Sequence, residues 1–350
     1  MGHKAFWSFF VKRTLLFLLV VWSAMTINFI IPRFAPGNPV RAHVLSVVGV
    51  TADQSATNDL VKYYEEYFGI NDPLLVQYFR FITNTFRGDL GYSIAQFPRT
   101  IWDMIREKII WTLQLVLPAT LIAAVAGSLL GALFAWPRMP KIYNATLPLL
   151  ILFSSIPAFL AAIALIYVFS YKLDLLPLMG AYDTTFVAHV IPISANSSIP
   201  DYSHWPTFQQ ILKHSVLPLL SLILVQLGGW ALGMRGMMIT IQNEDYMNFA
   251  EAKGLTARRL FSYTLRNALL PMSTNLGLSL STALTGGILV EAIFSYPGIG
   301  GLINSAISVN DYPVIFANSV ILITLLAGAT FLLALIYPLL DPRINYEGRA

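Results

Sequence analysis

The stretch that decides the fold is 113–135, which reads LQLVLPATLIAAVAGSLLGALFA and carries no charged side chain. As a helix rising about 1.5 Å per residue, it is long enough to cross the ~30 Å hydrocarbon core of a bilayer. Lipid offers the backbone no hydrogen-bond partner, so a helix that satisfies its own amides is the expected structure. Pro118, Gly127 and Gly131 fit such a helix, because neighbouring helices can satisfy the backbone and small residues permit close helix contact.

Five further apolar stretches of spanning length repeat this character along the chain. They lie at about 14–31, 145–171, 215–234, 272–293 and 314–338. Of the 350 residues, 56% are hydrophobic and 11% are charged, whereas a soluble domain has roughly 25% charged residues. The sequence therefore predicts an all-α membrane protein with six transmembrane helices.

The first stretch requires a choice between a membrane anchor and a cleaved signal peptide. Lys4, Lys12 and Arg13 precede it, but no small-residue cleavage pattern follows it. We therefore expect a retained first helix. The chain has no cysteine, which excludes disulfides and thiolate metal sites.

The basic residues orient the six helices. If Met1 is cytoplasmic, the two shorter outside loops hold only Lys172 and Lys213, and segment 32–112 has as many acidic as basic residues. Cytoplasmic loops keep an excess of Lys and Arg, while long translocated segments count little. Both termini are therefore expected in the cytoplasm, and the net charge of +4 needs no nucleic-acid partner. The basic residues on the cytoplasmic side are Lys4, Lys12, Arg13, Arg138, Lys141, Arg235, Lys253, Arg258, Arg259, Arg266, Arg343 and Arg349.

These spans divide the chain into three parts. Residues 1–31 form the cytoplasmic tail and first helix, and 32–112 form a long extracytoplasmic segment with helical character at 58–68. Residues 113–350 form the core, with five helices and a cytoplasmic loop at 236–271. The simplest role for the long segment is a cap over the outer face of the helices.

The cytoplasmic loop is the most distinctive polar segment. Residues 243–271 read NEDYMNFAEAKGLTARRLFSYTLRNALLP. Asn243 is expected to cap a short helix with acidic residues in its first turn, and Gly254 to end that helix. Thr256 is then expected to cap a second helix. Ordinary connections between helices are shorter, so this hairpin indicates a docking site for a protein partner.

The hairpin, with AEAKGL at 250–255 and LRNALLP at 265–271, resembles the coupling loop of ABC-importer permeases. Over almost its whole length the chain resembles the first membrane subunit of the dipeptide/oligopeptide permease family. The other motifs that carry the resemblance are PGNP at 36–39, RGDLGYS at 87–93, LP at 176–177 with Gly180, EAIFSYPGIG at 291–300, DYP at 311–313 and DPR at 341–343.

The resemblance implies a type I ABC-importer permease fold that forms half of a translocation pathway. It implies four kinds of partner: a second, homologous permease subunit, two cytoplasmic ATPase subunits that bind ATP and Mg, an extracellular or periplasmic solute-binding protein, and the lipid bilayer of a prokaryotic inner membrane. The short loop helix is expected to dock on an ATPase subunit. The residues that carry this role by resemblance are Glu244, Asp245, Tyr246, Phe249, Ala250, Glu251, Ala252, Lys253, Gly254, Leu255 and Thr256.

A few positions depart from the family pattern. Glu251 stands where this branch often has a basic residue, Asn38 replaces an acid, and Thr330 and Ala334 stand where the family tends to carry Asn and Asp. The outer loop 181–213 is longer than usual. The resemblance therefore implies peptides as the first candidate solute and leaves oligosaccharides, nickel and glutathione as alternatives.

Other chemistry finds no support in the sequence. No Lys follows a Gly, so the chain lacks a phosphate-binding P-loop, and ATP hydrolysis is expected on other polypeptides. The five histidines have no metal-ligand spacing, and there is no Gly-x-Ser-x-Gly elbow. We expect no catalytic residue, no metal site and no cofactor on this chain.

The fifth span leaves two readings open. Its polar residues Ser279, Ser281, Thr282 and Thr285 either line a translocation path or pack between helices. Glu291, near the outer end, is either a functional carboxylate in the path or a hydrated interfacial one. A stand-alone secondary transporter or channel is the alternative function, although matching broken helices and buried charges, which are common in that class, are not evident.

Overall fold

The computed structural model describes residues 3–34, 41, 44, 54–69, 71–137, 142–183, 205–273 and 275–340. Within these ranges the secondary structure is helical, apart from an isolated antiparallel bridge between Tyr92 and Thr100. The predicted all-α class is confirmed. Several features named above lie outside the described residues, namely the motifs at 36–39 and 341–343, the loop at 184–204, and Arg138, Lys141, Arg343 and Arg349.

Within the described ranges, five helices are long and apolar enough to cross a membrane. They are α1 (His3–Phe34), α5 (Ile101–Ala135), α9 (Trp205–Gln242), α12 (Asn275–Ile293) and α14 (Tyr312–Leu340). Each matches one of the predicted apolar stretches. Because α5 begins at Ile101, one continuous helix crosses the division placed at residue 112 and joins the extracytoplasmic segment to the core.

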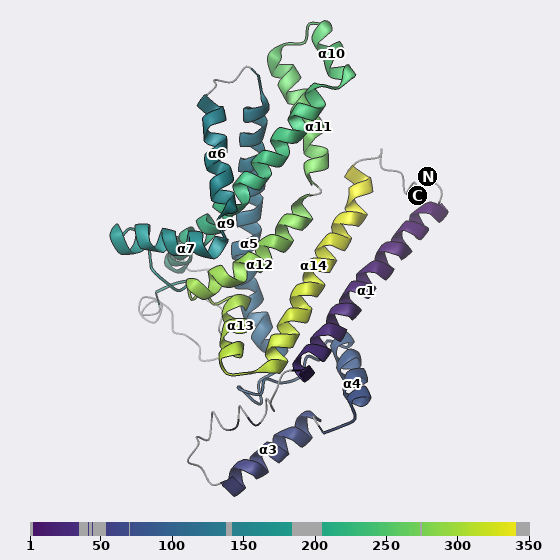
Figure 1. Ribbon diagram of the computed structural model, residues 1–350, viewed down its shortest axis with the longest axis vertical. Helices are drawn as coiled ribbons and strands as arrows, with labels where there is room; N and C mark the ends of the chain where they lie inside the picture. Colours follow the sequence, from purple (N-terminus) through teal and green to yellow (C-terminus); the bar gives the residue numbers. More distant parts are fainter. Residues whose placement is uncertain are drawn as a thin grey trace.

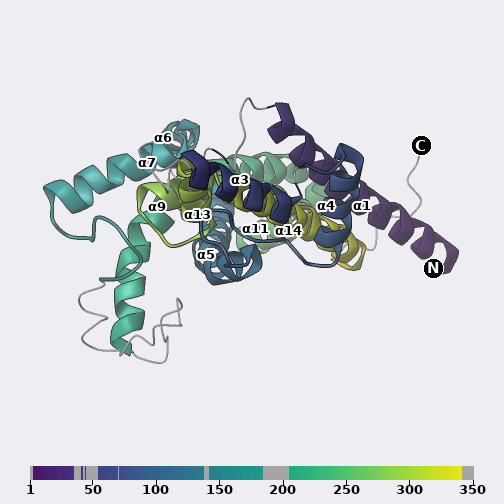
Figure 2. The same ribbon diagram turned by 90° about the horizontal axis from the view of Figure 1, so that it is seen from below.

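The third predicted span, 145–171, is not one straight helix, and the prediction is wrong in this respect. It consists of α6 (Ile142–Ser155) and α7 (Ala158–Leu165), which continues as the π-helix η1 (Ile166–Lys172); the two arms are bent by 101°. Pro157 explains the break, since it has no N–H and disfavours helical geometry at the residue before it. The bent pair makes the sixth span if it crosses as one unit. α7 projects from the flank opposite α1 (Figures 1 and 2).

α5 and α9 pack along each other at the centre of the core. Glycine permits this contact, because a Cβ added at Gly131 would overlap the carbonyl group of Ala231. α6 approaches α9 in the same way, where a Cβ at Gly228 would overlap the Ser154 side chain. The predicted close packing through small residues is confirmed at these two glycines.

Shorter helices lie at the two ends of the spans. At one end are α3 (Gln54–Phe68), α4 (Leu74–Phe86) and α13 (Ile299–Ser308) (Figure 1). At the other end are α10 (Asp245–Ala252) and α11 (Ala257–Ser273), and the start of α1 and the end of α14 lie toward that side (Figure 1). α3 confirms the helix expected at 58–68. This arrangement separates the 243–271 hairpin from the extracytoplasmic segment by the length of the spans.

Candidate coupling hairpin and transport cleft

The short helix of the hairpin, α10, starts one residue later than expected. Its N-cap is Glu244, whose backbone is extended (φ −75°, ψ 144°) and whose side chain makes no capping hydrogen bond. The prediction that Asn243 caps the helix is therefore wrong. Asp245 lies in the first turn, where a negative charge is favoured by the helix dipole.

The turn between α10 and α11 has the geometry that the sequence predicts. Gly254 adopts a left-handed backbone (φ +79°). Its N–H donates to the Glu251 carbonyl at 2.9 Å, and the Leu255 N–H donates to the Ala250 carbonyl at 3.3 Å, which together close the end of α10. A Cβ at Gly254 would meet nothing within 4 Å, so the requirement for glycine here is the backbone angle rather than space. Thr256 directly precedes α11.

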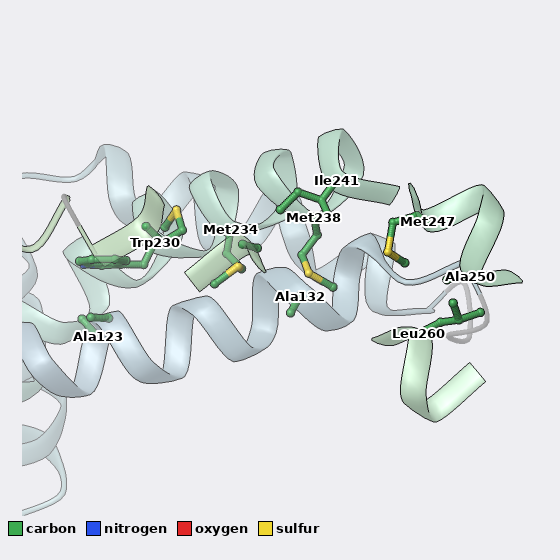
Figure 3. Packing of buried hydrophobic residues seen from close by; sticks show 12 residues of the cluster. Ala123, Ala132, Trp230, Met234, Met238, Ile241, Met247, Ala250 and Leu260 are labelled. Carbon is green, nitrogen blue, oxygen red and sulfur yellow. The ribbon is translucent and has the colours of Figure 1, made fainter. Parts of the chain in front are cut away.

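One face of α10 is fixed to the spans. Met247 (5% exposed) and Ala250 (8%) belong to a buried cluster that also contains Met238 of α9 and Leu260 of α11. Figure 3 shows these side chains continuing along α9 toward Trp230. Ala250, expected to contact a partner, instead packs internally, and sequence reasoning overlooked Met247. Met247 lies three residues before Ala250, and this helical spacing of two apolar residues could have indicated a buried face.

The opposite face of α10 is exposed. Phe249 is 61% exposed, with the Lys253 ammonium 4.4 Å from its ring centre. Tyr246 is 41% exposed and meets the ring of Tyr263 edge to face at 6.0 Å. The other exposed residues that the resemblance singled out are Glu244, Asp245, Glu251, Ala252, Gly254 and Thr256, while Leu255 is half-buried. The hairpin thus presents an aromatic and charged surface on a fixed base.

A cleft of about 660 Å³ lies between the α6–α7 break, α9 and α12. Ser279 and Thr285 of α12 border it, as do Gly229 and Gln226 of α9 and Pro157 at the break. Ser279 and Thr285 therefore border a cavity, as a role in lining a translocation path requires. The side chains of Ser281 and Thr282 lie outside the described part of the structure.

Glu291 does not border this cleft. It is fully buried (0% exposed), and its carboxylate accepts a hydrogen bond from the Gly300 N–H at 2.7 Å. The neighbouring Ile299 N–H donates to Thr112 of α5 at 2.9 Å. Both donors are in the first turn of α13. The N–H groups of a first turn have no acceptor within their own helix and are satisfied by other elements. The expectation of a hydrated interfacial carboxylate is wrong, because Glu291 holds α13 in place from inside the protein.

Comparison with known proteins explains this combination of hairpin and cleft. The family described as "Binding-protein-dependent transport system inner membrane component" matches residues 127–346, which include both. The chain belongs to this family. The permease is 32% identical to the probable D,D-dipeptide transport system permease protein DdpB of Escherichia coli (strain K12), over 98% of this chain and 99% of that protein.

Two further relatives cover the permease as completely. The oligopeptide transport system permease protein AppB of Bacillus subtilis (strain 168) is 30% identical over 97% of this chain and 99% of its own length. The di/tripeptide transport system permease protein DppB of Pseudomonas aeruginosa (strain UCBPP-PA14) is 30% identical with the same coverage. The resemblance to dipeptide and oligopeptide permeases is confirmed, and the permease is a transport component rather than an enzyme.

In the permease, two motifs far apart in sequence meet at Asp311 (2% exposed). The Ser93 hydroxyl donates a hydrogen bond to this carboxylate. The N–H groups of Ile94 and Ala95 also donate to it, each at 3.2 Å. Asp311 thereby ties segment 32–112 to the turn between α13 and α14. Among the described residues, no group of three or more His, Cys, Asp or Glu side chains is placed to hold a metal ion.

Proposed function

We propose that this permease is one of two membrane subunits of an ATP-driven importer and that the α10–α11 hairpin docks on a cytoplasmic ATPase subunit. The observation that carries the proposal is the division of α10 into two faces. Met247 and Ala250 fix one face to the spans, whereas Tyr246 and Phe249 leave the other exposed. Exposed aromatic side chains on a rigid base are typical of residues that dominate protein interfaces.

The buried cluster explains how force on α10 reaches the cleft. Met247 packs in the same cluster as Met238 and Trp230 of α9, and Trp230 borders the cleft. Close-packed interiors transmit displacement rather than absorb it. Movement of the ATPase subunit would therefore shift α9 against α6–α7 and α12, which changes access to the cleft.

The remaining parts of the proposal concern the solute and the partners. Relatives named for D,D-dipeptides, oligopeptides and di/tripeptides favour a peptide over an oligosaccharide. A second homologous permease would complete the pathway, a solute-binding protein would deliver the peptide, and ATP and Mg would bind to the ATPase subunits. Ser279 and Thr285, with Ser281 and Thr282 on the same helix, contribute polar groups to the path, and both ends of the chain face the cytoplasm.

The test uses two glycines with the same backbone angle. Gly254 and Gly88 both have φ +79°, and a Cβ at either would meet nothing within 4 Å. Gly254→Val and Gly88→Val therefore impose a similar local strain, one in the hairpin and one in the extracytoplasmic segment. In proteoliposomes with the co-purified partner subunits, ATP-driven peptide uptake should fall about tenfold in Gly254→Val, which corresponds to roughly 1.4 kcal/mol, and little in Gly88→Val.

Equal effects of the two substitutions would contradict the coupling role. Uptake by the reconstituted chain alone, driven by an ion gradient and independent of ATP, would instead favour a secondary transporter. Uptake of an oligosaccharide but not of any peptide would preserve the coupling role and overturn the assigned solute.

A further inference from the structure

A second, polar cavity lies at the extracytoplasmic end of the molecule. It has a volume of about 300 Å³ and lies between the start of α5, the chain before it and the first turns of α13. Arg99, Glu107 and Lys108 border it on one side, and Gly298 and Gly301 on the other. α13 follows α12, which borders the larger cleft, and lies toward the end of the molecule opposite the α10–α11 hairpin (Figure 1).

The charges around this cavity do not cancel. Arg99 pairs with Glu107 at 2.5 Å and also donates to the Gln96 side chain at 3.2 Å. Lys108 is half-buried and forms no ion pair with any residue that the structure describes. Lys108 and Arg99 both interact with the Glu107 carboxylate, so two cations share one anion, and a second anion would stabilise the partly desolvated ammonium group. Among the side chains that border the cavity, the two cations Arg99 and Lys108 exceed the one anion, Glu107, by one positive charge; the Glu291 carboxylate lies behind Gly298 and is bound by the Gly300 N–H.

The wall formed by α13 adds a backbone donor to this charge. The N–H groups of Ile299 and Gly300 are occupied by Thr112 and Glu291. The next N–H, of Gly301, has no acceptor among the described residues. A Cβ at Gly298 would overlap the Glu291 carboxylate, so this glycine is required by packing behind the cavity wall. An anion in the cavity would find its donors in the Gly301 N–H and the Lys108 ammonium, both of which belong to bordering residues.

We propose that this cavity binds the free carboxylate of the transported peptide as it enters the permease. The inference rests on the proposed function, which supplies the peptide. One excess positive charge matches a single carboxylate, and the cavity has room for a terminal residue but not for a whole oligopeptide. The phosphate of a lipid headgroup has related chemistry, and the experiment separates the two sources.

The experiment combines a substitution of Lys108 in the permease with a change at the C-terminus of the peptide, so that their effects on uptake can be compared. Lys108→Gln and wild-type permease, each with the partner subunits in proteoliposomes, are given a tripeptide with a free C-terminus or the same tripeptide with a C-terminal amide. Any preference of the solute-binding protein for either peptide is common to both permeases and cancels. Lys172→Gln is the matched control, because Lys172 is an exposed lysine on the proposed outer side that lies over the Tyr167 ring.

The expected result is a fall of about tenfold in uptake of the free peptide by Lys108→Gln, in the range for a charged hydrogen bond. Uptake of the amide should not change, and Lys172→Gln should behave as wild type with both. Equal losses for both peptides, or no loss for either, would overturn the inference. An effect of Lys108→Gln that appears only in vesicles with anionic lipid would assign the cavity to a headgroup and also overturn it. Failure of wild-type permease to take up either peptide would instead contradict the proposed function.

Discussion

The two ends of the permease use acidic side chains in opposite ways. At the hairpin end, Glu244 and Asp245 are exposed around the start of α10, and the Glu244 side chain makes no capping hydrogen bond. At the opposite end, Glu291 and Asp311 are 0% and 2% exposed. Each buried carboxylate receives hydrogen bonds from backbone or hydroxyl groups of another segment.

This difference indicates what each end is built to do. Buried carboxylates are costly unless they are hydrogen-bonded, so those at Glu291 and Asp311 fix α13 and the extracytoplasmic segment in one arrangement. Exposed acids cost little and remain available to a partner. Substitutions at the outer end should therefore change stability, whereas those on the exposed face of α10 should change coupling at nearly constant stability.

Asp311→Ala should have the largest effect on stability. It removes the acceptor for Ser93, Ile94 and Ala95 together and leaves buried donors unsatisfied, at a cost of about 3 kcal/mol. Denaturant unfolding of the purified permease in detergent measures this change. Asp72→Ala is the control, since Asp72 is a partly exposed partner of Arg80 whose loss should cost less than about 1 kcal/mol. Equal destabilisation by the two would remove the basis of the comparison.

Glu291 should show a smaller effect that depends on the replacement. Glu291→Ala removes the acceptor of the Gly300 N–H and should cost about 2 kcal/mol. Glu291→Gln keeps a carbonyl oxygen of the same reach and should retain much of that stability. The same unfolding measurement on both variants decides the point, and a Gln variant as unstable as the Ala variant would show that the charge, rather than the hydrogen bond, holds α13.

Phe249→Ala should have the smallest effect on stability. The side chain is 61% exposed, so the free energy of unfolding should change by no more than about 0.5 kcal/mol. ATP-driven uptake should nevertheless fall several-fold, because an aromatic contact with the ATPase subunit is lost. Phe86→Ala, at an exposed position (55%) at the end of α4, should change neither quantity. Normal uptake in Phe249→Ala would remove this side chain from the proposed docking surface.

The features that the sequence predicts best are those determined by residues that are contiguous in the chain. The apolar runs locate the five spanning helices and both arms of the bent pair, and Gly254 locates the turn of the hairpin. The 101° bend at Pro157 was not predicted, because a proline inside an apolar run is compatible with a straight, kinked or broken helix.

Features that join distant segments could not be predicted in this way. Ser93 and Asp311 are 218 residues apart, and no local pattern pairs them. Burial of Glu291 depends on α13 folding back against it, which apolar periodicity does not indicate. Met247 could have been found from its spacing with Ala250, but its packing partners on α9 and α11 follow only from the three-dimensional arrangement.

The central claim, that the exposed face of α10 contacts an ATPase subunit, is tested most directly by cross-linking. The chain has no cysteine, so Phe249→Cys and the control Phe86→Cys each introduce a single site for a thiol-linked photo-cross-linker. In the assembled transporter, Phe249→Cys should yield a covalent adduct with the ATPase subunit, and Phe86→Cys should not. Absence of that adduct from Phe249→Cys in a complex that still hydrolyses ATP and transports, or an equal yield from Phe86→Cys, would contradict the claim.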